Sequence, residues 1–502
     1  MTQRGISLLL AGLVGLAACS DNPASSVATA APDAQALNAL AGDDTYLVRF
    51  TSGIPAGFAE QVAALGGEVV FAHVGAGVGA VSGLSPEAAA QLQGAGAGVT
   101  LAADATVELN VEVGDVEAAA SDATAQDATV ESPTNPATAF FYTRQWNMRA
   151  INANAAWAAG KLGSPAIKVG ILDTGLDYLH PDLYGRVDLA LSRSFLNAAE
   201  NARVQALFPG AHPVADLHYH GTHVGSTVTS NGYVAAGVTS RVTLVGLKVC
   251  TPGTAATGWR ASCPTSGTLN AVLYAADNGI PIINMSIGSS FLRRQVANNG
   301  GDEISFLETL NSVFNYARSK GTQVVVSAGN DATNMQNNGN GFKSYCDVPG
   351  VICVSSTGPG SAPRHGTYSD VDLLASYSNY GGKVTVAAPG GNGRGATVAN
   401  PVPNVGYVYA ACSGFTQVIN GCGTRFFNPA TGAWSGSVIG INGTSMASPT
   451  TAGVAALAAE RVGTHPSAIR GAVTGTSDDL GKRGNDPIYG AGRVNAARAA
   501  GL

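Results

Sequence analysis

The feature that most constrains this chain is a series of short, almost wholly apolar segments that begins after Phe140. They read IKVGILD, VTLVGLKV, IPIINMSIG and TQVVVSAGN, and stretches of helical character alternate with them. A strand that is apolar along its whole length is covered on both faces, which is typical of a parallel sheet. Residues 140–502 are therefore predicted to form an α/β domain whose mainly parallel sheet is flanked by helices.

A smaller folded unit is predicted at residues 44–112. TYLVRF and EVVFAHV resemble strands, AGFAEQVAAL suits a helix, and SPEAAAQLQ opens a second helix with a Ser-Pro start signal. VTLAADATVEL then closes the unit as a further strand. The order strand, helix, strand, strand, helix, strand fits a small α+β ferredoxin-like domain.

Two other segments have the composition of connections. Residues 20–43 are rich in Ala, Ser and Asp and are interpreted as a tether that need not fold. Residues 113–139 hold acidic and small residues without periodicity, which is typical of a linker.

The first 19 residues have the pattern of an export signal. Arg4 precedes an apolar run, ISLLLAGLVGLAA, that is too short to span a bilayer and ends in small residues. The sequence LAAC at residues 16–19 resembles the lipobox of bacterial lipoproteins, which implies that Cys19 is lipidated and attaches the precursor to a membrane. In the alternative, an ordinary signal peptide is cut near Ala18 and Cys19 has no role. Both interpretations predict export to the cell envelope or beyond.

Six further cysteines occur as three neighbouring pairs, which favours an oxidising compartment. Pairing within each neighbourhood would close three local disulfides, although six cysteines permit 15 pairings. A zinc site is the alternative, but the chain has no CxxC spacing. The cysteines are Cys250 and Cys263, Cys346 and Cys353, and Cys412 and Cys422.

Composition excludes some partners. Hydrophobic residues make up 45% of the chain and charged residues 12%, which indicates a globular protein rather than a disordered one. The net charge is −6 and Lys and Arg form no run, so nucleic acid is not expected as a partner.

Three motifs carry residues of catalytic type, and each is ambiguous when taken alone. Asp173 ends the strand-like VGILD and could be a turn residue. His220 begins HGTHVG, where two histidines three apart could be structural or bind zinc. Ser445 lies in GTSMASP before an Ala-rich helix and could be a helix cap.

Taken together in the order Asp, His, Ser, these motifs resemble those of the subtilisin-like (subtilase) family. The resemblance covers about 140–502 and implies a three-layer subtilisin-like fold and a serine endopeptidase with Asp173, His220 and Ser445 as its triad. VSAGN implies that the Asn330 side chain receives the oxyanion. NMSIG implies a substrate-binding edge at Ser286, Ile287 and Gly288, and the primary pocket would include Ser327, Ala328 and Gly329.

The same resemblance implies a precursor. Residues 44–112 are similar to the family's propeptide, a folding aid and inhibitor that docks on the Ser286–Gly288 edge, so the chain is expected to cut itself within 113–141. No cofactor is implied for catalysis, but Asp182 in HPDL matches a structural calcium ligand of the family; a solvated turn acid is the alternative. Substrates would be proteins or peptides. A surface lipoprotein that binds peptides through the same fold without catalysis is the rival interpretation.

Overall fold

The computed structural model describes most of the chain from residue 45 onward, within one unit, Ala39–Leu502. The export signal, Cys19 and the tether 20–43 lie outside the described residues. Within the described part, no helix is long and apolar enough to cross a membrane. The described ranges are 45–95, 98–109, 112–120, 135–254, 257, 259–288, 290–292, 303–336, 341–343, 345–360, 370–392, 406–420, 422, 425–428 and 433–502.

The larger domain is built on an eight-stranded sheet in the order β17-β16-β14-β12-β7-β9-β8, with β18 also paired to β16. Every pair in it is parallel except β16–β17. The mainly parallel sheet predicted from the apolar segments is thereby confirmed. Its strands are β7 (Lys168–Asp173), β8 (Arg193–Ser194), β9 (Thr243–Lys248), β12 (Ile282–Met285), β14 (Gln323–Ser327), β16 (Ile352–Gly358), β17 (Leu373–Leu374) and β18 (Val386–Pro389).

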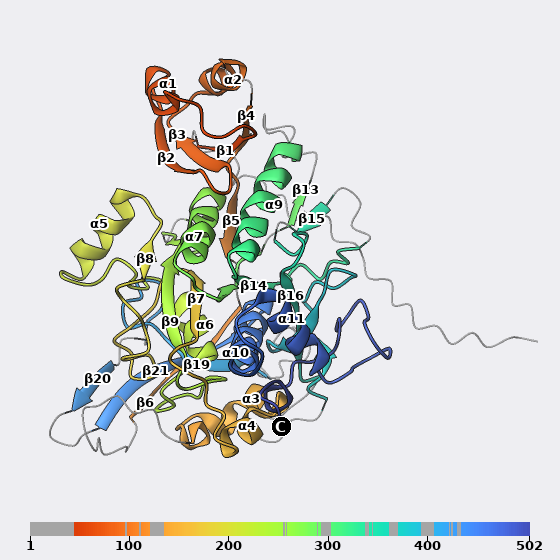
Figure 1. Ribbon diagram of the computed structural model, residues 1–502. Coiled ribbons are helices and arrows are strands. Elements are labelled where there is room, and N and C mark those ends of the chain that lie inside the picture. Colours follow the sequence, from red (N-terminus) through yellow and green to blue (C-terminus); the bar gives the residue numbers. More distant parts are fainter. Residues whose placement is uncertain are drawn as a thin grey trace, which may run out of the picture. The chain divides into compact units, whose positions relative to one another are not determined.

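Helices cover both faces of this sheet because successive strand residues point to opposite sides. Ile171 packs in the core cluster that contains α6 (His220–Val228), α10 (Thr444–Val462) and α11 (Pro466–Gly475). Leu172 packs in the cluster of α7 (Thr265–Asp277) and α9 (Glu303–Ser319), labelled in Figure 1. Among the described residues, the domain also has the α-helices α3 (Trp146–Ala150), α4 (Ala153–Ala158), α5 (Ala198–Leu207) and α12 (Ala496–Ala499).

The N-terminal unit has the predicted order and a four-stranded antiparallel sheet, β2-β3-β1-β4. Val48 packs one face of the sheet against its own two helices, while Leu47 belongs to the cluster of α7 and α9. The sheet therefore buries its second face on the larger domain. Its elements are β1 (Tyr46–Phe50), α1 (Phe58–Ala64), β2 (Glu68–His73), β3 (Val78–Ser82), α2 (Pro86–Ala95) and β4 (Val99–Ala103).

The segment predicted as one closing strand is split in two. After β4, Asp104 accepts a hydrogen bond from Ser266 N (3.0 Å) at the start of α7, and Ala105 O accepts one from Thr265 N (2.9 Å). These contacts redirect the chain into β5 (Thr106–Leu109). Strand β5 pairs antiparallel with β11 (Ala261–Pro264), which also pairs with β10 (Thr251–Pro252).

The first part of the predicted linker forms a strand, β6 (Glu112–Ala120). It pairs antiparallel with β21 (Ala433–Asn442), the strand that leads into α10. Strand β21 also pairs with β19 (Val408–Ala411) and β20 (Arg425–Asn428), and a separate two-stranded sheet joins β13 (Ser290–Leu292) to β15 (Gly341–Lys343).

The six cysteines form the three local disulfides predicted from their spacing. The bridged residues are separated by 13, 7 and 10 positions along the chain. They are Cys250–Cys263, Cys346–Cys353 and Cys412–Cys422.

Candidate active site

Asp173 and His220 form a fully buried pair at the carboxyl end of β7. His220 is the first residue of α6, and its Nδ1 lies 2.7 Å from Asp173 Oδ1. The same carboxylate oxygen accepts a hydrogen bond from Thr174 N (2.8 Å). Among the described residues, the second carboxylate oxygen and His220 Nε2 have no hydrogen-bond partner. The imidazole is thus held at one nitrogen, and the other remains available for proton transfer.

The glycine after His220 explains why the motif has this local sequence. A β-carbon placed on Gly221 would lie 2.2 Å from Gly175 O and 3.1 Å from the Asp173 side chain. No larger residue fits without moving the first turn of α6 away from the end of β7. The HGTH pattern therefore brings His220 close to Asp173.

Ser445 lies in the first turn of α10, which packs against α6. Its Oγ donates a hydrogen bond to Ser286 O (3.2 Å), and Ser286 Oγ donates to Ser445 O (2.8 Å). The N-terminal end of a helix carries partial positive charge, which favours negative charge that develops beside it. This is a suitable position for a nucleophile whose reaction forms an oxyanion.

Thr444 fixes the orientation of the Asn330 side chain. Asn330 Oδ1 accepts hydrogen bonds from Thr444 N (2.9 Å) and Thr444 Oγ1 (2.8 Å), while Thr444 Oγ1 accepts one from Gly329 N (3.1 Å). Because both bonds use the amide oxygen, they leave the two N–H groups of Asn330 able to donate to another acceptor. A β-carbon on Gly443 would lie 3.4 Å from Asn330 Nδ2, so this amide nitrogen lies beside the chain that leads into Ser445.

The two predicted substrate-binding segments lie side by side. They follow β12 and β14, which are adjacent parallel strands, and a β-carbon on Gly288 would lie 3.1 Å from Ser327 O. The side chains of Ile287 and Ala328 are buried in the core cluster of α7 and α9. These two side chains therefore anchor the two segments to the core. A substrate would contact mainly the backbone around Ser286, Gly288 and Gly329.

Strand β11 is a further element of the site that sequence reasoning missed. The Trp259 carbonyl just before it lies 3.3 Å from His218 Nε2, and Leu109 of β5 pairs with Ala261. The N-terminal unit therefore pairs its last strand, β5, with β11. Docking on the Ser286–Gly288 edge stays a prediction, because residues 110–111, which follow β5, lie outside the described residues. The signal available was the short alternating segment ASCP directly before a helical pattern.

The two other histidines of this region are unsuited to proton transfer near neutral pH. Burial lowers the pKa of His218 and that of His223 to about 3. His223 Nε2 lies 3.0 Å from Val408 O, and the described residues contain no group of three or more metal-ligating side chains able to hold an ion. A zinc site at the HGTHVG motif is therefore not supported.

The environment of Asp182 does not fit the predicted calcium site. Its Oδ1 accepts hydrogen bonds from Tyr233 N and Val234 N, and its Oδ2 accepts one from Ala235 N, all at 2.9 Å. A calcium site presents oxygen ligands to the ion, whereas three N–H groups point at this carboxylate. Asp182 is also fully buried, so it is not a solvated turn acid either. The loop after α6 contacts the acid directly.

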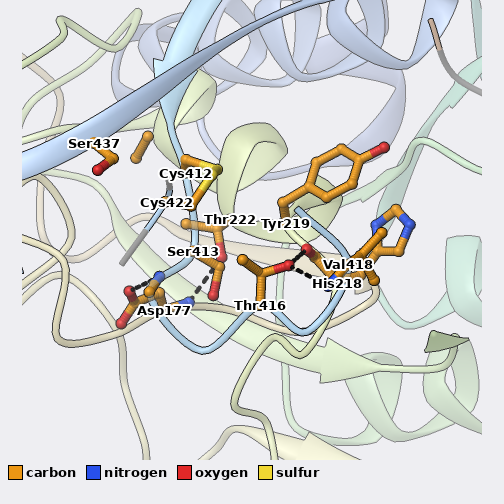
Figure 2. Close-up of a disulfide and its surroundings, with 12 residues drawn as sticks. Asp177, His218, Tyr219, Thr222, Cys412, Ser413, Thr416, Val418, Cys422 and Ser437 are labelled. Carbon is orange, nitrogen blue, oxygen red and sulfur yellow. Dashed lines mark hydrogen bonds between the residues drawn. A yellow bond between two sulfur atoms is a disulfide. The ribbon is translucent and has the colours of Figure 1, made fainter. Parts of the chain in front are cut away.

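The loop closed by Cys412–Cys422 supports the segment before His220 (Figure 2). Three successive carbonyls each accept a hydrogen bond from it. This loop therefore braces the chain that leads to His220. The bonds run from Ser413 Oγ to Asp216 O (2.7 Å), from Gln417 N to Leu217 O (2.9 Å), and from Thr416 Oγ1 to His218 O.

Comparison with known proteins gives one consistent likeness. Residues 164–492 match the model described as the subtilase family. Thermitase of Thermoactinomyces vulgaris is 29% identical over 371 residues, which cover 73% of this chain and 99% of thermitase. A thermophilic serine proteinase of Bacillus sp. (strain AK1) is 28% identical over 369 residues, covering 72% of this chain and 69% of that protein.

A solved structure extends the likeness beyond the larger domain. The epidermin leader peptide processing serine protease of Staphylococcus aureus aligns with a TM-score of 0.65 and 20% identity. The alignment covers 92% of this chain and 98% of the other. At that identity the likeness concerns the fold.

Proposed function

The chain belongs to the subtilase family of serine peptidases, and from that premise we propose that it is an exported endopeptidase, made as a precursor. It cuts peptide bonds in proteins with Asp173, His220 and Ser445. The observation that carries the proposal is the buried 2.7 Å contact between His220 Nδ1 and Asp173 Oδ1, with Nε2 of the same ring unpartnered among the described residues.

The proton path follows from these contacts. Ser445 Oγ turns from Ser286 O toward the scissile carbonyl and gives its proton to His220 Nε2 as it attacks. Asp173 accepts the hydrogen bond from Nδ1–H, which holds the imidazole in the tautomer with a free Nε2 and stabilises the imidazolium. The imidazolium then protonates the leaving amine, and water hydrolyses the acyl-enzyme by the reverse sequence.

Two donors serve the tetrahedral oxyanion in this mechanism. One is the Asn330 side chain, which Thr444 holds by its oxygen so that its N–H groups are free to donate. The other is the backbone N–H of Ser445 at the positive end of α10. Donors that are oriented before the reaction need no rearrangement as charge develops, which is why such sites lower the barrier.

The precursor would hold its own chain in the cleft as an inhibitor. Strand β5 pairs with β11 upstream of the triad, and β6 pairs with β21, which leads into Ser445. We propose that the first cut falls between Leu109 and Glu112, where the chain passes from one strand to the other. A second cut within 113–141, the segment predicted from composition, would release β6 from the larger domain.

Localisation follows the same proposal. An export signal delivers the precursor to an oxidising compartment, where the three disulfides form. Lipid at Cys19 would attach the uncut chain to a membrane of the envelope. The first cut would then separate the larger domain from its anchor, and the enzyme would act outside the cell.

A fluorophosphonate probe tests the proposal directly. The exported wild-type protein is expected to become labelled at Ser445, and the Ser445→Ala variant is expected to remain unlabelled, because the probe reacts with an activated serine. Intact-mass measurement of the same samples reports the first cut. Equal labelling of the two proteins would rule out Ser445 as the nucleophile. A correctly folded wild type without labelling would indicate a peptide-binding protein without catalysis.

A further inference from the structure

Strand β6 lies along one edge of β21. Pairing runs from Ser435 with Ala120 to Asn442 with Glu112, and the register shifts between Ile439 and Ile441. Gly436 pairs with Arg425 of β20 as well as with β6, so those two strands lie on opposite edges of β21. We call the edge that carries β6, Ser435–Asn442, the β21 edge. On it, β6 has the position of an added antiparallel strand.

The β21 edge leads directly to the nucleophile. Asn442 lies three positions before Ser445 and is paired with Glu112. Upstream in the chain, Leu109 is paired with Ala261 of β11. A polypeptide that runs in this direction therefore leaves β11 before the triad and joins β21 after it. With the proposed cut between Leu109 and Glu112, β11 would bind the acyl side of the chain and the β21 edge the leaving side.

We propose that the β21 edge is an extended binding surface for the leaving side of substrates, several residues longer than the reacting centre requires. The inference rests on the proposed function. Its ligand is an unfolded polypeptide segment that follows the scissile bond and adds to the sheet as an antiparallel strand. Main-chain hydrogen bonds would supply the affinity in such an addition, so the surface selects extended conformation more than sequence.

The edge is held in position before any substrate arrives. Ile439 and Ile441 are buried in the main core, and Val438 packs with Tyr407 and Tyr409. Gly440 brings the strand against the aromatic pair, because a β-carbon there would lie 2.9 Å from the Tyr407 side chain. A strand packed on both faces loses little freedom when a ligand pairs with it, so more of the pairing energy appears as affinity.

A series of peptides with one acyl-side sequence tests this surface. The leaving side is lengthened from about two to about eight residues, and kcat/KM is measured with the processed enzyme. We expect kcat/KM to rise at least about tenfold over the series, because each added pair of main-chain hydrogen bonds contributes a modest net gain. A flat series with efficient cleavage throughout would overturn the inference and leave the proposed function intact. Failure to cut any member would overturn both.

Proline replacements supply the matched control within the longest peptide. Alternate residues of an added strand direct their N–H and C=O groups to the partner strand. The pairing is regular beyond the register shift, where residues 116–120 of β6 pair with β21. At the corresponding leaving-side positions, proline at one set of alternate residues should lower kcat/KM severalfold, and proline at the intervening residues should have a smaller effect. A loss that does not alternate along the chain would contradict pairing with the β21 edge.

A separate observation concerns the loop closed by Cys412–Cys422. It donates hydrogen bonds to the carbonyls of residues 216–218, shortly before His220, and Gly414 N donates to Asp177 Oδ2 (2.7 Å). Phe415 anchors it between Tyr178 and Phe208, with ring centroids 5.6 and 5.0 Å away. The loop is thus tied both to the body of the domain and to the chain that enters α6 (Figure 2).

From these contacts the structure assigns Thr416 as a positioning residue for His220. Its hydroxyl donates to His218 O, two residues before the catalytic base, and accepts a bond from Val418 N (3.2 Å). It makes none of the contacts that define the triad pair. Loss of this hydroxyl should loosen the entry to α6 and misalign the imidazole, without altering the segments that bind substrate.

The test compares Thr416→Val with Thr476→Val. Thr476 Oγ1 likewise donates to a backbone carbonyl, Ala472 O (2.7 Å), but at the C-terminal end of α11. Thr416→Val should lower kcat about tenfold with KM unchanged within about twofold, an effect typical of a small misplacement of a catalytic group. Thr476→Val should change neither value.

Thr416→Ser is the conservative arm of this test, since it keeps the hydroxyl and should restore kcat. Three results would overturn the assignment: an unchanged kcat in Thr416→Val, an increase in KM alone, or equal losses in the Val and Ser variants. If Thr416→Val yields no folded enzyme, the Ser variant decides. A Ser variant with wild-type kcat supports the hydroxyl role, and one with lowered kcat contradicts it.

Discussion

Replacement of Ser445 by alanine is expected to lower kcat by about 10⁶, a magnitude taken from the equivalent change in subtilisin itself. The reason is the loss of the oxygen that forms the acyl-enzyme, while the Asn330 amide and the binding segments remain. The residual rate should stay above that of water alone. Peptide hydrolysis and the intact mass of the precursor are the measurements, and the mass should remain that of the uncut chain.

Ser448→Ala is the matched control for this variant. Ser448 lies in the same helix, is fully buried, and donates to Asn284 Oδ1 (2.7 Å) rather than facing the triad. Its replacement removes one buried hydrogen bond and should affect stability more than turnover. Comparable losses of kcat in the two variants would mean that the packing of α10, and not a nucleophile, explains the effect.

Asp173→Asn is expected to lower kcat by about 10⁴, as the corresponding change does in trypsin-like enzymes. The substituted amide can present N–H to His220 Nδ1, which now lies 2.7 Å from a carboxylate oxygen. Nδ1 would then accept a bond and Nε2 would carry the proton, so the imidazole could no longer take the proton of Ser445. Single-turnover acylation by an activated ester isolates this step.

Asp188→Asn controls for the loss of a carboxylate near β7. Asp188 is partly exposed and lies 3.3 Å from Lys168 Nζ at the start of the strand, far along β7 from the triad. Exposed ion pairs contribute little, so its turnover should stay within about twofold of wild type. Wild-type acylation by Asp173→Asn would remove Asp173 from the mechanism.

Much of the fold could be predicted because the strands have a strong local signal. Apolar residues on both faces of β7, β9, β12 and β14 indicate a covered parallel sheet, and the order of strand-like and helical segments in residues 44–112 indicates a small α+β unit. The break between β4 and β5 could not be read in the same way. It depends on hydrogen bonds from α7 to Asp104 and Ala105, which form between distant parts of the chain.

In the site, too, features with a local sequence signal could be predicted, and features that depend on distant contacts could not. The motifs around Asp173, His220, Asn330 and Ser445 each have recognisable local sequence, and the structure places Asp173 in contact with His220. Asp182 also has the expected local sequence, but the loop that faces it presents N–H groups instead of oxygen ligands. The local sequence around a residue does not show which backbone groups of a distant loop will contact that residue.

The bonds from the 412–422 loop to the carbonyls of residues 216–218 had no sequence signal at all. The proximity of Cys412 and Cys422 in the sequence indicated a disulfide. The bonded carbonyl groups could not be predicted, because every residue has a backbone carbonyl. These hydrogen bonds can be recognised only in the three-dimensional structure, where the two segments lie side by side. Strand β6 is similar, since its acidic and small residues are typical of a linker and the partner strand supplies the pairing.

Because β6 is paired with β21, the first cut would break the chain without removing β6 from its binding edge. After a cut between Leu109 and Glu112, β6 remains covalently joined to the larger domain through residues 121–134. Its return to β21 is then unimolecular, with an effective concentration in the millimolar range for a short connection. A substrate must therefore compete with β6 for the β21 edge, and dilution of the enzyme does not weaken this competition, because β6 is covalently attached. Activity on long substrates would therefore lag behind the first cut until the connection through residues 121–134 is also cut. The length of this lag would not depend on enzyme concentration.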